Sequence, residues 1–150
     1  LSHLEEISTE VVAMPENEGT SVVFACLVLR GKDLVPQEVT DAIGIHPTKS
    51  FKRGDTRTGT KKWPHGYWEL SSKEAIHSSD LSMHLEWLAK QLELVTTQIN
   101  KIIDKEGVDA EVSCFWILPT SHESLSLSSE LMMRIASLGL KIDIDIYGPH

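Results

Sequence analysis

Six basic residues and several aromatic side chains lie close together in the first half of the chain. Between positions 49 and 62 they are opposed by a single acid, Asp55, so the segment carries a charge of +5. The basic residues are Lys49, Lys52, Arg53, Arg57, Lys61 and Lys62, and the aromatic residues that follow are Trp63, His65, Tyr67 and Trp68. Cations beside aromatic faces are the ingredients of an anion site, and in particular of single-strand nucleic-acid binding.

This segment is therefore the candidate ligand site. Its candidate residues are Lys52, Arg53, Arg57, Lys61, Lys62, Trp63, His65 and Tyr67. We expect Trp68 to point into the core, which leaves Trp63 and Tyr67 as the exposed rings. The chain as a whole has a net charge of −8 and repels phosphate beyond a Debye length of the segment. A structural explanation also exists, because Lys and Arg on an exposed strand deter edge-to-edge pairing of sheets.

The same segment resembles a phosphate-binding P-loop only in part. Gly54 and Gly59 are separated by four residues, but Thr60 rather than lysine follows the second glycine. A P-loop also needs a strand before it and a helix after it, so that backbone N–H groups face the phosphate, whereas a hairpin is expected here. The pattern does not predict nucleotide binding by this loop.

Other reactive residue types lack the spacing of a catalytic or metal site. The seven histidines form no HxH, HxxxH or HExxH pair, and we interpret them as surface and loop residues. Asp143 and Asp145 alternate with isoleucines, which indicates a solvated strand face. Cys26 and Cys114 lie in apolar runs and could be neighbours in a sheet, but such surroundings favour reduced, inert thiols. No catalytic residue, metal or cofactor is predicted, and an enzyme is disfavoured.

The elements that position these residues follow from hydrophobic periodicity. Strands are predicted over 21–30, 49–53, 66–71, 110–118 and 141–147, and helices over 35–43, 81–102 and 129–138. Residues 54–64 are then the long basic loop of a hairpin. The apolar stripe over 81–102 could form a coiled coil, but its β-branched run at 95–97 favours a break and a helix pair packed on a sheet.

The predicted order, β-α-β-β-α-β-α-β, indicates an α+β fold. Its first six elements match a two-layer sandwich with a ferredoxin-like β-α-β-β-α-β core, which a C-terminal helix and strand extend. Residues 1–20 read as a loosely held N-terminal arm, and residues 21–150 as a single α+β domain. No apolar run approaches the roughly 20 residues of a membrane span, and no targeting signal is read, so a cytoplasmic protein is expected.

Several segments resemble a known family. The stretch from Val35 to Thr40, the run Gly44-Ile45-His46-Pro47-Thr48, the pair Gly54-Asp55 and the strand around Trp68 are similar to the domain-of-unknown-function 4279 family, found widely in bacteria. The closing strand, residues 138–147, is similar to the family's last strand. The resemblance covers residues 22–147. It implies a small compact α+β protein and no activity.

Two functional hypotheses follow. The leading one is a non-catalytic protein-interaction domain, immunity-like or regulatory, whose charge of about −13 outside the basic segment attracts a basic protein partner. The alternative is binding of an anionic small molecule or single-stranded nucleic acid through the basic hairpin 49–62. A pocket that joined His46, His65 and a carboxylate would instead indicate an enzyme.

The first strand also bears on assembly, because both of its faces are apolar. Leaving a large aliphatic side chain exposed costs about 1.5 to 3 kcal/mol, so the sheet face opposite the helices needs a cover. Either the third helix, near residues 129–138, crosses to that face or a second copy packs on it as a symmetric homodimer. The polar pairs Glu111/Ser113 and Asp143/Asp145 make parts of that face hydrophilic.

Overall fold

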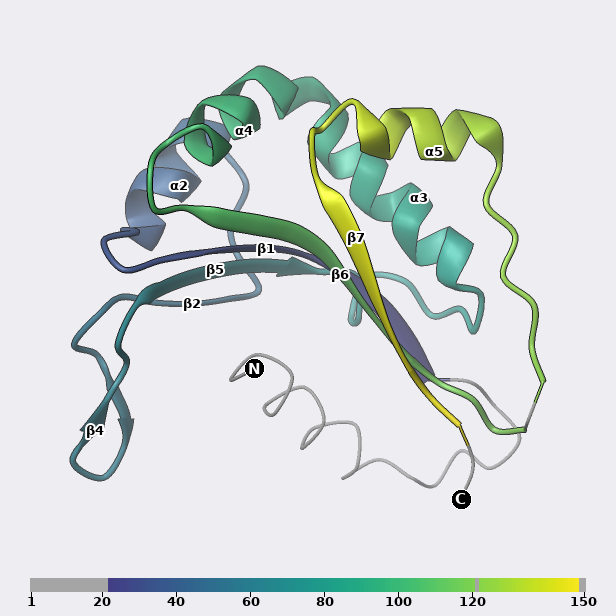
Figure 1. The fold of residues 1–150 in the computed structure, drawn as a ribbon, viewed down its shortest axis with the longest axis horizontal. Helices are drawn as coiled ribbons and strands as arrows, with labels where there is room; N and C mark the ends of the chain where they lie inside the picture. The colour runs from purple at the N-terminus through teal and green to yellow at the C-terminus, as the bar shows by residue number, and fades with distance from the viewer. Residues whose placement is uncertain (1–21, 121, 149–150) are drawn as a thin grey trace.

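The computed structural model describes residues 22–120 and 122–148 (Figure 1). The predicted N-terminal arm, residues 1–20, lies outside the described residues. The elements are β1 (Val22–Gly31), α2 (Pro36–Ile43), β2 (Lys49–Phe51), β3 (Thr56–Thr58), β4 (Lys61–Lys62), β5 (Gly66–Ser71), α3 (Leu81–Leu92), a 3₁₀ turn η1 (Glu93–Val95), α4 (Thr96–Ile103), β6 (Asp109–Ile117), α5 (Ser129–Ala136) and β7 (Lys141–Tyr147).

A five-stranded sheet forms one layer of the fold. Its strand order is β2-β5-β1-β6-β7, and β3 and β4 form a separate two-stranded sheet. The β2/β5, β5/β1 and β1/β6 pairs are antiparallel, whereas β6 and β7 are parallel. The fold is therefore a mixed α+β fold with a mostly antiparallel sheet, which confirms the predicted class.

Strand β1 is the central strand because it is apolar on both faces. Every residue from Val23 to Leu29 is buried, and β1 pairs with β5 on one side and β6 on the other. Alternate residues belong to two separate apolar clusters: Ala25, Leu27 and Leu29 face the helices, whereas Phe24, Cys26 and Val28 face the other side.

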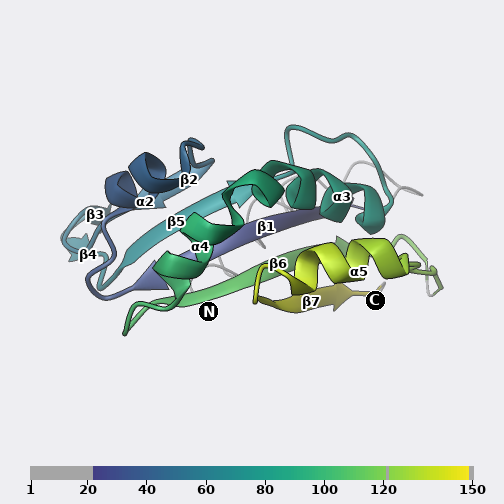
Figure 2. The ribbon, with the colours of Figure 1, turned by 90° about the horizontal axis from the view of Figure 1, so that it is seen from above.

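Helices α2, α3, α4 and α5 all lie over one face of the sheet (Figures 1 and 2). Asp80 caps α3 by accepting a hydrogen bond from the Ser82 N–H, at 2.9 Å. The apolar stripe continues from α3 into α4, and the break between them falls at Glu93–Val95, next to the predicted position. A helix pair packed on a sheet is thus confirmed, and the coiled coil is not formed.

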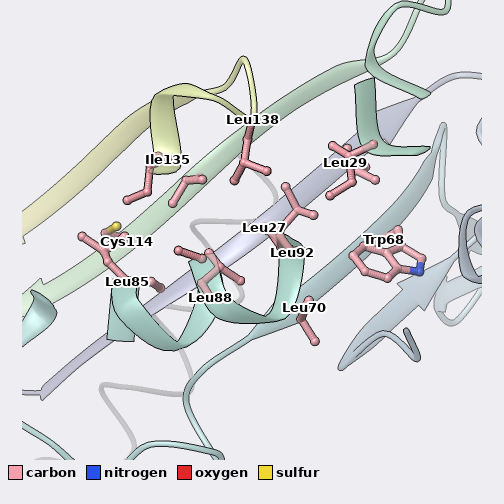
Figure 3. Close-up of a cluster of buried hydrophobic side chains, with 14 of the residues drawn as sticks. Leu27, Leu29, Trp68, Leu70, Leu85, Leu88, Leu92, Cys114, Ile135 and Leu138 are labelled. Carbon is pink, nitrogen blue, oxygen red and sulfur yellow. The ribbon is translucent and has the colours of Figure 1, made fainter. Parts of the chain in front are cut away.

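The buried side chains between the helices and the sheet form one cluster. Figure 3 shows Leu85, Leu88 and Leu92 of α3 against Leu27 and Leu29 of β1, with Trp68 beside them. The Trp68 ring is fully buried, as predicted, and its Nε1–H donates to Thr40 Oγ1 at 3.1 Å. This bond ties β5 to α2.

Of the two covers considered for the second sheet face, the third helix is ruled out. Helix α5 packs beside α3, and its Leu131 and Ile135 join the same cluster as α3. Arg134 of α5 forms ion pairs with Glu86 and Glu93, at 3.0 and 3.3 Å, which hold the two helices side by side.

The side chains on the second face are nevertheless buried. Phe24, Cys26, Val28 and Phe115 are each at most 3% exposed. Helices α2, α3, α4 and α5 lie on the other face, so the described residues leave the predicted homodimer untested. The oligomeric state stays a prediction.

The two cysteines do not neighbour each other across the sheet. Cys26 is directly opposite Ser113, whereas Cys114 is opposite Ala25, so the two thiols point to opposite faces. Both are free and buried. The two residues lie on neighbouring strands, but the register is offset by one residue, which reverses the face in a strand.

Candidate functional site

The basic segment forms an arm that extends from one edge of the sheet (Figure 1). Strand β2 ends at Phe51, earlier than predicted, and the expected loop contains the short antiparallel pair β3/β4. Backbone hydrogen bonds close its base: the Gly54 N–H donates to the Trp63 carbonyl and the Trp63 N–H donates to the Asp55 carbonyl, each at 2.9 Å. We call residues 52–63 the basic arm.

Asp55, the one acid of the segment, shapes a turn rather than neutralising a cation. Its Oδ2 accepts a hydrogen bond from the Lys52 backbone N–H at 2.9 Å, and its own N–H donates to the Lys52 carbonyl at 3.1 Å. Gly54, between them, has φ of 93°, which a side chain would strain. The Gly54-Asp55 pair therefore sets the direction in which the arm leaves β2.

A row of parallel aromatic rings supports the arm from the sheet outward. The Phe51 ring stacks on Tyr67 with centroids 5.0 Å apart, and on Trp63 with centroids 3.7 Å apart. The guanidinium carbon of Arg57 lies 4.7 Å from the Trp63 centroid. The order Tyr67, Phe51, Trp63, Arg57 thus leads from β5, through the edge strand β2, into the basic arm.

This row corrects the prediction that Trp63 and Tyr67 are exposed rings. Trp63 is 8% exposed and Tyr67 2% exposed. Because neighbouring side chains occupy their faces, neither ring is available to stack a nucleotide base. Sequence reasoning missed this because it did not assign Phe51, the ring between them, to the same sheet face.

The predicted cations, in contrast, all lie at the surface. Lys52, Arg53, Arg57, Lys61 and Lys62 are exposed. Arg53 forms an ion pair with Asp33 at 3.4 Å, and Lys62 Nζ donates to Thr56 Oγ1 at 3.0 Å. Lys49, at the base of the arm, is half-buried, and burial lowers its pKa, helped by Arg57 and opposed by Glu69. The arm therefore displays positive charge on a folded support.

His65 is half-buried beside this support. Its ring meets the Phe51 ring edge-on, with centroids 5.9 Å apart. Burial lowers the pKa of His65, and the nearby Arg30 charge lowers it further. His46 is exposed, in the loop before β2.

The second sheet face holds a buried carboxyl beneath the aromatic row. The Tyr67 hydroxyl donates to Glu69 Oε1 at 2.5 Å, and Glu69 is 7% exposed. Burial, together with the Glu69 charge, raises the pKa of Tyr67, so the phenol keeps its proton as the donor. Burial likewise raises the pKa of Cys26, and raises that of Cys114 to about 12. These thiols are not nucleophiles at neutral pH.

A buried serine–histidine pair was not predicted. Ser72 Oγ lies 2.6 Å from His84 Nδ1, and His84 Nε2 lies 2.8 Å from the Ser78 carbonyl. A carbonyl only accepts, so Nε2 carries the proton, and Ser72 donates to Nδ1 while accepting from the Ala25 N–H at 2.9 Å. Both side chains are at most 1% exposed. The pair joins α3 to β1 and to the end of β5.

The interpretation of every histidine as a surface or loop residue is therefore wrong for His84. The signal was present in the sequence: His84 lies three residues after Leu81 and four before Leu88, on the inward stripe of α3.

Charged groups gather again at the opposite edge of the sheet. Arg30 forms an ion pair with Glu111 at 2.7 Å, and Lys141 forms one with Asp143 at 3.5 Å. Burial and the neighbouring Asp143 raise the pKa of Glu111 to about 7, against the lowering effect of Arg30. The Glu111 hydrogen bond lowers the pKa of Asp143. As the pH falls, Glu111 is therefore protonated before Asp143.

The sequence has also been compared with known proteins. Residues 20–149 match the family described as Domain of unknown function (DUF4279). The chain belongs to this family. No match was found among curated proteins or among solved structures.

The residues that carry the resemblance to DUF4279 have structural roles in this chain. Gly44 ends α2 in the left-handed conformation, with φ of 73°, and its N–H donates to the Thr40 carbonyl. Thr48 joins β2 to β5, because its Oγ1 accepts from the Ser71 N–H at 2.9 Å. Together with the Asp55 turn and the buried Trp68, these contacts tie α2 and β2 to β5 and shape the start of the arm in this DUF4279 domain.

Two surface clefts of the DUF4279 domain lie outside the row of aromatic rings, and Asp33, the partner of Arg53, lines the first. One, of about 240 Å³, lies between α2 and the turn after α4; Leu34 and Ile102 line its floor, and Lys32 and Glu106 are on its rim. The other, of about 310 Å³, lies at the start of α3 and is lined mainly by serines and by Asp80 and Glu123. Neither cleft contains a histidine or a cysteine.

Within residues 22–120 and 122–148, no three His, Cys, Asp or Glu side chains come close enough to hold a metal ion. No helix in the same ranges has the length and apolar character needed to span a bilayer.

Proposed function

We propose that this DUF4279 protein is a non-catalytic protein-interaction domain, of an immunity-like or regulatory kind, that binds a basic partner. The observation that carries the proposal is the separation of charge across the sheet. The basic arm leaves the β2 edge, whereas Asp143 and Asp145 lie on β7 at the opposite edge. Outside residues 49–62 the chain has a charge of −13. An acidic surface with its basic residues gathered at one edge speeds the association with a basic protein and orients it.

The buried chemistry supports a binding role. Ser72 and His84 are occupied by hydrogen bonds inside the core, and the Cys26 and Cys114 thiols are protonated and buried. The free cysteines also agree with a cytoplasmic location, which is part of the proposal.

The strand order supports the proposal that the sheet contains a ferredoxin-like core. Strand β5 lies between β1 and β2, and β1 lies between β5 and β6, as two interleaved split β-α-β units would place them. Strand β7 extends this proposed core beyond β6.

A second candidate function is binding of an anionic small molecule or single-stranded nucleic acid by the basic arm. The exposure of Lys52, Arg53, Arg57, Lys61 and Lys62 favours it. The burial of Trp63 and Tyr67 limits it to contacts with phosphate or carboxylate groups, because base stacking on these rings is blocked.

Affinity purification from the native organism at low salt tests the first proposal. We expect a stoichiometric basic protein that is released as salt is raised. Charge reversal on the arm, Lys61→Glu with Lys62→Glu, is expected to leave this partner bound. The matched control reverses two charges elsewhere, Lys90→Glu with Lys101→Glu.

The second function predicts that the arm variant loses its ligand. Labelled oligonucleotides or phosphorylated metabolites should then bind the native chain and the control variant but not the arm variant. Recovery of no protein partner would reject the first proposal.

A further inference from the structure

The outer edge of the sheet at β7 has a backbone that is ready to pair. Within residues 22–120 and 122–148, β6 is the only strand hydrogen-bonded to β7, which is the last strand in the order (Figure 2). The Tyr147 carbonyl accepts from the Leu118 N–H at 2.8 Å and so points toward β6. Because successive residues of a strand alternate sides, the N–H and C=O groups of Ile142, Ile144 and Ile146 point outward.

This edge has only part of the usual protection against pairing, namely the charges of Lys141, Asp143 and Asp145. Natural edge strands are short, bulged, interrupted by proline or charged, most often with lysine. Strand β2, at the other edge, has three residues and leads into the basic arm. Strand β7 has seven residues in unbroken register with β6, no proline, and one lysine at its first position. Ile146 and Tyr147 are also 55% and 42% exposed.

The side chains of β7 define what a partner strand must carry. Ile142, Ile144 and Ile146 are in register with Val112, Cys114 and Trp116 and so face the helices. Asp143 and Asp145 lie on the other face, next to Ser113 and Phe115. A strand added outside β7 would place aliphatic side chains beside the isoleucines and cations beside the two carboxylates.

The carboxylates disfavour a second copy of this chain as the occupant. An antiparallel pairing of two β7 strands centred on Ile144 sets Asp143 opposite Asp145 of the other copy, twice. Like charges directly opposite each other destabilise a sheet. A register centred on Ile142 would pair Lys141 with Asp143 but would leave the exposed Ile146 and Tyr147 without cross-strand partners.

We propose that β7 is the docking edge for an extended basic segment of a partner protein, with lysine or arginine alternating with β-branched residues, which adds to the sheet as a sixth strand. This inference rests on the proposed function and names the surface at which the partner binds. Backbone hydrogen bonds from the three isoleucines supply the pairing, and Asp143 and Asp145 select the charge.

A synthetic heptapeptide of alternating lysine and valine tests the proposal on the full chain. We expect it to bind at low salt and to slow hydrogen exchange of the Ile142, Ile144 and Ile146 amides. A peptide of the same composition with its lysines and valines in two blocks, and one of alternating glutamate and valine, are expected to bind at least about tenfold more weakly, since each loses paired cross-strand contacts.

Ile146→Pro is the decisive variant. It removes an outward N–H from a largely exposed position, and proline is tolerated where the N–H side of an edge strand faces solvent. We expect about tenfold weaker peptide binding, the effect of one lost hydrogen bond with its steric block. Ile146→Val keeps the N–H and should bind normally. Asp145→Asn should weaken binding about threefold, whereas Glu74→Gln, which removes a charge in the loop after β5, should not.

Three outcomes would overturn the proposal. In the first, the alternating and blocked peptides bind equally well; in the second, the folded Ile146→Pro variant binds the peptide as the native chain does; in the third, the peptide protects amides outside β7. Self-association that Ile146→Pro abolishes would overturn it in favour of a second copy. A native partner that is still captured by Ile146→Pro rejects the β7 edge but leaves the interaction function standing, whereas absence of any native partner rejects the function itself.

Discussion

The Arg57 guanidinium and the Phe51 ring enclose the Trp63 ring at the base of the basic arm. Phe51 stacks 3.7 Å from the Trp63 centroid, so Arg57, at 4.7 Å, must lie over the other face. A cation of the predicted ligand site thus contributes to the fold of that site. Trp63 acts as a structural link between the edge strand β2 and the arm, and its removal should loosen the arm.

Replacing Trp63 with alanine is expected to destabilise the protein by about 3 kcal/mol, because a buried ring and two stacked neighbours lose their contacts. Arg57→Ala should cost less than about 1 kcal/mol, the usual value of an exposed cation–π pair. Urea unfolding followed by far-UV circular dichroism measures both. Trp63→Phe, which keeps a ring, is the control, and an alanine variant as stable as the native chain would contradict the structural role.

His84 should make stability depend on pH. Burial is the main cause that lowers the pKa of His84 below its ordinary value of 6.5. The unfolded chain therefore binds a proton at His84 more readily than the folded chain does. Stability should therefore fall as the pH drops below about 6.5, where unfolded histidine titrates. We expect His84→Gln, measured by urea unfolding from pH 8 to 5, to show a smaller loss than the native chain.

The exposed His46, in the loop before β2, provides the control for this prediction. His46→Gln should keep the part of the pH dependence that His84 causes. If His84→Gln lost stability in parallel with the native chain over the same range, the buried histidine would not be the titrating group.

The two thiols should be unreactive until the protein unfolds. Cys26 is fully buried and Cys114 is 1% exposed, and burial raises both pKa values. Titration with a disulfide reagent at pH 8 is expected to detect no fast-reacting thiol in the native chain and both thiols in urea. Rapid labelling of either cysteine under native conditions would show that its side of the sheet opens readily.

Element positions were predictable because they depend on local patterns. The apolar run of β1, the apolar stripe over 81–102 and the alternation of β7 each gave boundaries within a few residues. The register of the sheet was not predictable. The sequence left open whether Cys26 and Cys114 are neighbours, and one residue of offset between β1 and β6 places them on opposite faces.

The candidate site was predictable in its charges but not in its rings. Lysines and arginines remain at the surface wherever a hairpin carries them, so their exposure followed from composition. The burial of Trp63 and Tyr67 depends on Phe51, which lies on β2 and meets them only after the hairpin closes. The Ser72–His84 bond similarly joins two residues that are 12 positions apart in the sequence.

Gly66, where the arm rejoins the sheet, should not tolerate any side chain. A Cβ at this position would lie 1.9 Å from the Leu34 carbonyl oxygen and 2.8 Å from the Leu34 carbonyl carbon, and both are backbone atoms that cannot rotate away. Strand β5 would have to move from the β1–α2 turn, disturbing Tyr67 and Trp68 next to it. We expect Gly66→Ala to lose about 3 kcal/mol or more of unfolding free energy, the upper range for overpacking.

Gly148→Ala is the matched control for this substitution, because a Cβ there meets nothing within 4 Å and the residue is exposed. It should change stability by less than about 0.5 kcal/mol, as ordinary surface substitutions do. Thermal unfolding of the two variants side by side, with near-UV circular dichroism to follow the tryptophans, gives the comparison. Equal stability of Gly66→Ala and Gly148→Ala would mean that β5 can shift away from Leu34 freely, and that the base of the arm is not held where the structure places it.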